Sequence, residues 1–395
     1  MNFTICHKDK CTGCSACKDI CPKQCITMTP DDLDALHPVI DKEICINCGL
    51  CIKTCPNNFK LDFYSTQKVW AAWSKDDIVR RQSASGGVAY ELYRYWLRNG
   101  GVAAGVVYES HNGCKFILIE KESDIPLTQN SKYTFSDTAG IFIKVKQKLI
   151  EGIQVLFIGV PCQVAALYSF LKKPYDNLTT VDIICHGMPP AEYLRQHVKN
   201  IERKKKSLTS HLSFRDPQYF THTFTFTLRD LTGKAFYKKK VLSRDNYQLG
   251  YHKALIYREN CYSCNYAHRE RIADLTIGDF SGLGRFAPLD FERLKVSCIL
   301  QNTNKGAQLI SKAAEFLTLH ERPAQEAFDI ERQLREPSIK HPQRKNFEKE
   351  YRKNKNFKQA ADKALKLEKL RTIKKDVVIK CKRVAYNALV LMHIK

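Results

Sequence analysis

With 395 residues, the chain is too long for one small domain and long enough for two or three units with cores of their own. Its net charge of +23 is compatible with nucleic acid, anionic lipid or an acidic partner protein, and the charge alone does not choose among them. The longest apolar stretch, residues 155–171, is interrupted by Pro161 and Gln163 and falls short of the ~20 residues that a membrane-spanning helix needs.

The first 62 residues are organised around two copies of the pattern Cys-x2-Cys-x2-Cys-x3-Cys-Pro, at residues 11–22 and 45–56. Three thiolates two residues apart wrap one loop around a [4Fe–4S] cluster, and the fourth points to the partner cluster. We therefore expect one cluster on Cys11, Cys14, Cys17 and Cys55 and the other on Cys45, Cys48, Cys51 and Cys21. A zinc pair or a disulfide framework is the alternative, but two Cys-Pro endings are more specific than either.

This segment resembles a bacterial-type two-cluster ferredoxin, a class of proteins that transfers electrons. Iron–sulfur ligands need reduced thiols, and residues 1–10 lack the apolar core of a signal peptide. We therefore expect a cytoplasmic protein.

A linker at residues 60–68 is followed by a strand pattern at 69–73, a helix pattern at 88–97 and a buried-strand pattern at 102–108. Directly before the helix stand three small residues, Ser85, Gly86 and Gly87. The free N–H groups and dipole of a helix N-terminus favour a phosphate there. An ordinary N-cap with a turn explains the same residues, so both interpretations stay open.

Further on, the segment Lys132-Tyr133-Thr134-Phe135-Ser136 combines a cation, aromatic rings and hydroxyl groups. These are groups that contact an isoalloxazine ring or a diphosphate. By itself, however, the segment is indistinguishable from an ordinary loop.

Two α/β units come next, with buried-strand patterns at residues 154–159 and 180–184. Cys162, in a turn at 160–163, and Cys185 follow these strands, at the edge where open α/β sheets place their ligands. Antiparallel strands are expected at residues 211–215, 223–229 and 237–242, and another strand at 273–277. The pattern is helical from Ala307 onward.

Cys162, Cys185 and the pair Cys261-x2-Cys264 together make a set of four thiols. The set matches a site with four thiolate ligands. Two buried free cysteines beside an unrelated pair, or a zinc site, are the alternatives. The other cysteines, Cys6, Cys25, Cys114, Cys298 and Cys381, have no ligand spacing.

These motifs, in chain order, carry a resemblance to the beta-subunit family of coenzyme F420 hydrogenases and dehydrogenases. They are Val160-Pro161-Cys162-Gln163, Cys185-His186-Gly187, Cys261-x2-Cys264 and Ala273-Asp274-x3-Gly278-Asp279, with Ser85-Gly86-Gly87 and Lys132 to Ser136 before them. The resemblance implies FAD, a third [4Fe–4S] cluster on the four cysteines, and a flavin site that includes Ser85, Gly86, Gly87, Lys132, Tyr133, Thr134 and Ser136. Because the archaeal subunits lack the ferredoxin segment and the basic tail, it does not imply a substrate.

The expected architecture is α+β, with four parts. They are a ferredoxin-like domain at residues 1–62, the two halves of a mixed α/β flavin and iron–sulfur domain at 68–170 and 171–340, and a basic helical tail at 341–395. The tail carries 17 Lys/Arg against 5 Asp/Glu. In residues 374–395 an apolar stripe at helical spacing fits a helix packed on the core, a solvated arm, or an interfacial helix on anionic lipid.

We expect an iron–sulfur flavoprotein oxidoreductase that exchanges electrons with a ferredoxin-type carrier or a redox partner protein, and an unidentified acceptor. His186 and Asp279 stand beside the expected site, but each also has an ordinary structural explanation, so no catalytic acid or base is assigned. A non-catalytic electron-transfer subunit of a larger complex is the alternative. Nucleic acid is disfavoured, because the chain shows no helix-turn-helix, RRM or zinc-finger pattern.

Overall fold

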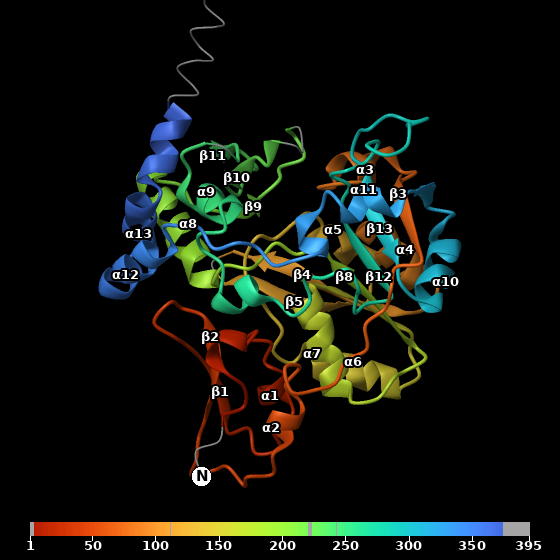
Figure 1. Cartoon of the computed structure of the whole chain (residues 1–395), viewed down its shortest axis with the longest axis horizontal. Coiled ribbons are helices and arrows are strands. Elements are labelled where there is room, and N and C mark those ends of the chain that lie inside the picture. The colour runs from red at the N-terminus through yellow and green to blue at the C-terminus, as the bar shows by residue number, and fades with distance from the viewer. Residues whose placement is uncertain (1–3, 111, 220–222, 242, 374–395) are drawn as a thin grey trace, which may run out of the picture.

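The computed structural model describes residues 4–110, 112–219, 223–241 and 243–373. Its N-terminal residues form a small unit below the larger body in Figure 1. The unit contains the strands β1 (Ile26–Pro30) and β2 (Leu36–Ile40), which pair antiparallel, the helices α1 (Ala16–Asp19) and α2 (Leu50–Lys53), and the 3-10 helix η1 (Lys8–Lys10).

The two cysteine runs adopt the same backbone conformation. Gly13 and Asn47 both have a positive φ, at 64° and 55°, and so do Ser15 and Gly49, at 59° and 71°. Each of these positions lies 34 residues from its counterpart, as do the cysteines. The sequence repeat is therefore also a structural repeat, with two equivalent loops.

The larger body is built on one nine-stranded mixed sheet with the order β14-β3-β13-β12-β8-β7-β4-β5-β6. Strands β4, β7, β8 and β12 run parallel to one another in its centre, and the β14, β3, β13 side is antiparallel. The strands are β3 (Lys68–Ser74), β4 (Val102–Glu109), β5 (Gly113–Ile119), β6 (Ser136–Asp137), β7 (Val155–Gly159), β8 (Leu178–Ile183), β12 (Leu275–Asp279), β13 (Ser297–Gln301) and β14 (Leu317–Arg322).

Helices cover both faces of this sheet, because its central strands are apolar on both sides. In β7, Val155 and Phe157 pack with the helices α6 (Ile141–Ile150) and α7 (Pro161–Leu171). The alternate residues Leu156 and Ile158 pack with α4 (Val88–Arg98) and α10 (Asn304–Ala313) on the other face. Short helices at the sheet ends are α3 (Asp77–Gln82), η2 (Glu122–Asp124), α5 (Ile125–Thr128), α11 (Ala324–Phe328) and η5 (Arg332–Leu334).

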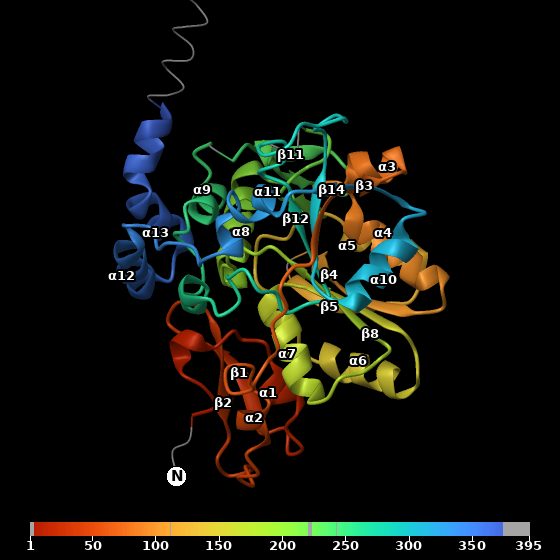
Figure 2. The ribbon, with the colours of Figure 1, turned by 45° about the vertical axis from the view of Figure 1, so that its right-hand side comes forward.

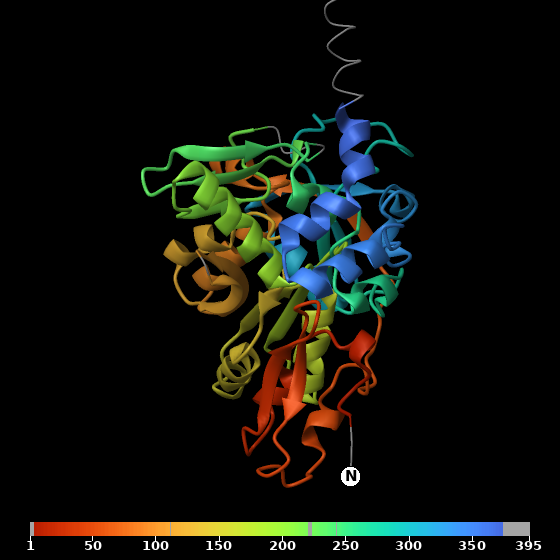
Figure 3. The same cartoon turned by 90° about the vertical axis from the view of Figure 1, so that its left-hand side faces the viewer.

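A second core lies beside the sheet, on the left in Figure 1. It joins a three-stranded sheet of order β11-β10-β9 to four helices, which gather at the end of the molecule shown in Figure 3. Leu33 of the ferredoxin unit is part of this core. Its elements are α8 (Ala191–Lys205), β9 (His211–Ser213), β10 (Phe226–Arg229), β11 (Ala235–Lys239), α9 (Asn246–His252), η4 (Glu259–Ser263), α12 (Arg344–Asn354) and α13 (Phe357–Ala364).

The structure confirms the mixed α/β architecture and most of the predicted elements. It differs at residues 160–163, where α7 begins at Pro161 instead of following a turn, because proline is well suited to the first position of a helix. The expected helical pattern after Ala307 is also interrupted. Strand β14 pairs there with β3 at the sheet edge, and this pairing is a long-range contact that local sequence does not reveal.

Both halves of the expected flavin domain contribute strands to the one nine-stranded sheet. The expected basic tail begins with α12 and α13, which pack into the second core. Residues 374–395, for which an apolar stripe was predicted, lie outside the described residues. Within the described part of the chain, no helix combines the length and apolar character needed to cross a membrane.

Candidate functional site

The eight cysteines of the two runs are gathered around two hollows. The inner hollow, nearer the large body, is lined by Cys11, Cys14, Cys17 and Cys55, together with Cys6. The outer hollow is lined by Cys21, Cys45, Cys48 and Cys51, together with Cys25. The fourth cysteine of each run thus lies with the first three of the other run, in the grouping that the spacing predicts.

Each hollow contains a fifth thiol that sequence reasoning set aside. The Sγ atoms of Cys25 and Cys21 are 3.4 Å apart. Cys6 interacts with both Cys11 and Cys55, and its hydrogen bond lowers the pKa of the Cys11 thiol to about 4 and that of Cys55 to about 7. No ligand spacing marked these two residues, because they lie outside the repeated pattern.

The other four-cysteine set also comes together, from segments up to about a hundred residues apart. Cys162 lies in the first turn of α7, Cys185 follows β8, Cys261 lies within η4, and Cys264 directly follows η4. The four thiols lie within electrostatic reach of one another, since each cysteine but Cys261 has others of the set among the charges that act on it. Burial raises the pKa of each thiol, that of Cys264 to about 11.

Four thiolates are the donor set of a [4Fe–4S] cluster. Zinc needs four sulfurs about 2.3 Å from one centre. In the described residues no three His, Cys, Asp or Glu side chains stand close enough to hold one metal ion. Backbone N–H groups of the kind that tune cluster sulfurs are also present. The N–H of Met188 donates to Cys261 Sγ at 3.4 Å, and those of Gly187 and Tyr266 face Cys185 and Cys264.

The inner hollow and the four-cysteine set are neighbours. Helix α1 packs against α7 and α6, as Figure 2 shows. Cys14 and Ala16 of the ferredoxin unit belong to the same apolar cluster as Cys162, Cys264 and Tyr266. Thr138 Oγ1 also donates to the Cys14 carbonyl at 2.6 Å. The order of the three sites is therefore outer, inner, four-cysteine.

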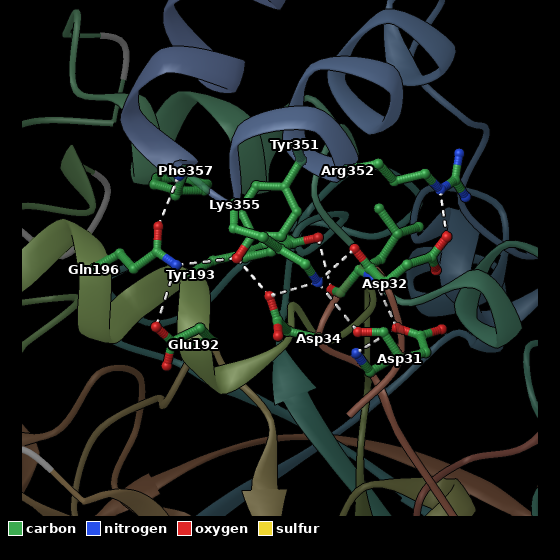
Figure 4. A network of polar contacts seen from close by, with 12 residues as sticks. Asp31, Asp32, Asp34, Glu192, Tyr193, Gln196, Tyr351, Arg352, Lys355 and Phe357 are labelled. Carbon is green, nitrogen blue, oxygen red and sulfur yellow. Dashed lines mark hydrogen bonds and ion pairs between the residues drawn. The ribbon is translucent and has the colours of Figure 1, made fainter. Parts of the chain in front are cut away.

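The hairpin between β1 and β2 fixes the ferredoxin unit from the opposite side (Figure 4). Tyr351 of α12 donates to the carboxylate of Asp34, and Arg352 Nε donates to Asp32 at 2.6 Å. Tyr193 of α8 donates to the Leu33 carbonyl at 2.9 Å. Part of the basic charge of residues 341–395 is thus directed at the aspartates of the hairpin, and the contacts position the unit on the large body.

The Ser85-Gly86-Gly87 segment lies at the start of α4, as expected, but it is also closely tied to the sheet. Ser85 Oγ donates to the Val296 carbonyl, and the Gly86 N–H donates to Ser297 Oγ, both at 2.9 Å. A Cβ at Gly86 would stand 2.3 Å from the Ala72 carbonyl oxygen, so only glycine fits. The Gly86 N–H therefore already has a hydrogen-bond acceptor within the protein.

The segment at residues 132–136 runs between the four-cysteine set and the second core. Lys132 Nζ donates to the carbonyls of Thr128 and Gln129, and burial lowers its pKa to about 8. The ring of Tyr133 stacks on Tyr251 with centroids 4.5 Å apart. The Ser136 carbonyl accepts a hydrogen bond from the side chain of Gln163, the residue after Cys162. The hydroxyl of Thr134 is buried and has no hydrogen-bond partner.

Sequence reasoning missed two cations beside these segments, because isolated basic residues give no signal. Arg215 Nη1 contacts both carboxylate oxygens of Asp279, at 2.9 and 2.7 Å, and its Nε is buried without a partner. Lys295 Nζ donates to the carbonyls of Arg81 and Ser83, the latter at 2.9 Å. Burial, with the charges of Arg215 and Arg80, lowers the pKa of Lys295 to about 8.

A half-buried histidine completes this group. His252 Nε2 has no hydrogen-bond partner, and its ring lies 5.9 Å from that of Tyr133. Burial, with His186 and Arg215 nearby, lowers the pKa of His252 to about 4. Its imidazole is therefore neutral at pH 7. The group Arg215, Lys295, His252 and Tyr133 offers cationic and neutral donors between the two expected flavin segments.

Three family models match separate parts of the chain. The model of the N-terminal part of the coenzyme F420 hydrogenase/dehydrogenase beta subunit matches residues 69–142, and that of its C-terminal part matches residues 153–327. The chain belongs to this family. A 4Fe–4S dicluster domain matches residues 10–59, so the family domain is preceded here by a ferredoxin-type domain. The resemblance inferred from the motifs is confirmed.

Two curated relatives come from Methanocaldococcus jannaschii. A coenzyme F420-dependent sulfite reductase is 25% identical over 193 residues, which are 47% of this chain and 29% of that protein. An uncharacterized ferredoxin is 39% identical over 54 residues, 14% of this chain and 69% of that protein. The match thus spans less than a third of the length of the sulfite reductase.

Among solved structures, a chain of the F420-reducing [NiFe] hydrogenase complex from Methanosarcina barkeri is similar with a TM-score of 0.45 and 17% identity. The similarity covers 78% of this chain and 94% of that chain.

Proposed function

We propose that this protein is an iron–sulfur flavoprotein oxidoreductase. It would exchange electrons between a ferredoxin-type carrier or redox partner and an unidentified acceptor, with three [4Fe–4S] clusters and FAD as cofactors. The observation that carries the proposal is the continuous order of sites, from the outer hollow to the inner hollow, the four-cysteine set and the segment at residues 132–136.

The cluster ligands in this proposal are the twelve cysteines of the three sites. The first cluster takes Cys11, Cys14, Cys17 and Cys55, the second takes Cys21, Cys45, Cys48 and Cys51, and the third takes Cys162, Cys185, Cys261 and Cys264. The chain would divide into a ferredoxin domain at residues 1–62, a flavin and iron–sulfur domain at 68–340 and a basic segment at 341–395.

FAD would lie between the two flavin segments, near Ser85, Gly86, Gly87, Lys132, Tyr133, Thr134 and Ser136. When bound, it supplies the exchange between single electrons and a hydride, which a cluster cannot perform. The residues around the site would bind and orient the flavin. Lys295 and Arg215 supply positive charge for a diphosphate, and the stacked rings of Tyr133 and Tyr251 help to exclude water.

Electrons would be exchanged with the partner at the outer hollow. Cys48 is exposed there, while the cysteines of the four-cysteine set are buried or half-buried. Ile46 lines this hollow and is 56% exposed, and Ile44, the chain neighbour of Cys45, is 51% exposed. A cluster of exposed apolar side chains at a solvent-facing redox site is typical of a docking surface, so we assign the contact with the redox partner to this face.

The main alternative is an electron-transfer subunit without a substrate of its own. It is favoured by the extent of the similarity, since the match covers only 29% of the related sulfite reductase. Turnover of an acceptor by the isolated chain would exclude this alternative. Activity that appears only after addition of a second protein would support it.

Anaerobic purification followed by iron, sulfide and flavin assays tests the cofactor set. Three clusters require about 12 iron and 12 sulfide per chain, and the ferredoxin domain alone requires about 8 of each. We expect the higher figure and about one FAD per chain. Protein with the lower iron figure and no flavin would be a ferredoxin-type electron carrier on an inactive scaffold.

The sequence pattern of residues 374–395 supports one more proposal, a peripheral contact with anionic lipid from the cytoplasmic side. Helices α12 and α13 belong to the second core, so a chain ending after Ile373 is the suitable comparison. We expect the full chain to sediment with anionic liposomes at low salt, and the shortened chain to remain in the supernatant. Equal sedimentation of both chains would remove the lipid role.

A further inference from the structure

Arg258 occupies the junction of three parts of the molecule. It precedes η4, and its backbone N–H donates to the Met188 carbonyl at 3.0 Å. Its side chain reaches into the ferredoxin unit, where Nη1 donates to the Thr12 carbonyl and Nη2 to the Cys11 carbonyl at 3.2 Å. The guanidinium also lies 4.8 Å from the centre of the Phe135 ring, inside the second flavin segment.

The charge of this guanidinium is buried and is not balanced by its hydrogen-bond acceptors. The residue is 2% exposed, its Nε has no partner, and its terminal nitrogens donate to neutral carbonyl groups. Arg271, another arginine beside the four-cysteine set, donates to the buried carboxylate of Asp182 at 3.1 Å. A buried charge without an opposite charge is strongly disfavoured, so the site of Arg258 calls for a negative partner.

This charge acts on thiols of both inner sites. Arg258 lies within electrostatic reach of Cys11 in the inner hollow and of Cys162 and Cys261 in the four-cysteine set. A [4Fe–4S] cluster with four thiolate ligands carries a net negative charge, which grows by one unit on reduction. A cation between two such clusters stabilises the reduced state of each, because the interaction is strong where water is excluded.

We propose that Arg258 is the shared counter-ion of the inner ferredoxin cluster and the cluster of the four-cysteine set. This inference rests on the proposed function. Arg258 raises the reduction potentials of both clusters together and keeps electron exchange between them close to balance. It also holds the loop at residues 11–14 against the large body, so that its role combines tuning with positioning.

The test is a redox titration of the full-length holoprotein, followed by EPR, with Arg258→Met and Arg258→Gln as neutral replacements. Glutamine keeps one donor for the Thr12 carbonyl, so it serves if the methionine variant loses cofactors. Each replacement should make reduction of the two inner clusters about tenfold less favourable, which is about 59 mV for a one-electron couple. The outer cluster should keep its potential and acts as the reference inside the same molecule.

Two further variants separate the charge from the contact. Arg258→Lys keeps the charge, so the reduction potentials of both inner clusters should stay close to those of the unmodified protein. Arg352→Met removes the ion pair with Asp32 on the ferredoxin hairpin and should leave all three potentials unchanged. A loss in Arg352→Met equal to that in Arg258→Gln would mean that domain docking alone sets the potentials, and would overturn the inference.

Iron analysis of the unmodified protein separates this inference from the proposed function. About 8 iron per chain would remove the third cluster, and the proposed function with it. About 12 iron, with inner potentials that do not move in either neutral variant, would overturn only the role of Arg258. A shift of all three clusters by the same amount would also overturn it, because the outer hollow does not share the guanidinium.

Discussion

Replacing Cys264 with alanine is the sharpest test of the four-cysteine site. Cys264 follows η4, and it lies in the apolar cluster that joins the ferredoxin unit to α7. With one of four thiolates gone, a cubane keeps an open iron corner and is readily lost. Iron and sulfide should fall from about 12 to about 8 per chain, a loss of one third. The EPR signals of the two ferredoxin clusters should remain.

Cys298→Ala is the matched control for this experiment. Cys298 is 1% exposed in the middle of β13, and it lines neither hollow of the ferredoxin unit. Its replacement removes a buried thiol of the same size, which costs packing but no ligand. We expect its iron content to equal that of the unmodified protein. Full iron in Cys264→Ala, or an equal loss in Cys298→Ala, would refute the assignment of the third cluster.

Three further predictions follow from particular contacts. The variant Cys21→Ala should keep much of the outer cluster, because Cys25 Sγ stands 3.4 Å from the lost sulfur. The double variant with Cys25→Ala should lose about 4 iron per chain. An equal iron content in the single and the double variant would contradict this prediction. Lys295 is protonated below its pKa of about 8, so the fraction of FAD that the protein retains should decline as the pH rises through that value. If Lys295→Met shows the same decline at the same pH, another group causes the pH dependence. Arg271→Met leaves the carboxylate of Asp182 buried and unpaired, which should cost about 3–5 kcal/mol of unfolding free energy in anaerobic denaturation, and an unchanged midpoint would disprove the ion pair's importance.

The ferredoxin unit was predictable from the sequence because its ligand set is local. The spacing within each run fixes which thiols share a loop, and the repeat at 34 residues carries the backbone conformation of Gly13 and Ser15 to Asn47 and Gly49. The central strands were also predictable. Their side chains are apolar on both faces, as β7 shows, and only a sheet covered on both sides satisfies such a run.

Other features depend on contacts between distant segments, and no local pattern encodes them. β14 is a strand because it completes the edge of β3, more than two hundred residues earlier in the chain. The sequence predicts that the basic segment after His341 is a tail. In the structure, however, Tyr351 and Arg352 of this segment contact the aspartates of the ferredoxin hairpin. Charge composition indicates how many cations a segment carries, and only the fold decides which of them meet a carboxylate.

The site itself divides in the same way. The motifs around four cysteines indicated candidate thiolate ligands, and the sequence by itself determined which residues these are: Cys162, Cys185, Cys261 and Cys264. Only the tertiary structure decided what stands between them and the ferredoxin unit. Arg258 and Lys295 are single basic residues with no motif, and their significance comes from burial and from the partners that long-range folding brings within reach. Electrostatic effects depend on distance and on exclusion of water, and the order of residues in the chain specifies neither.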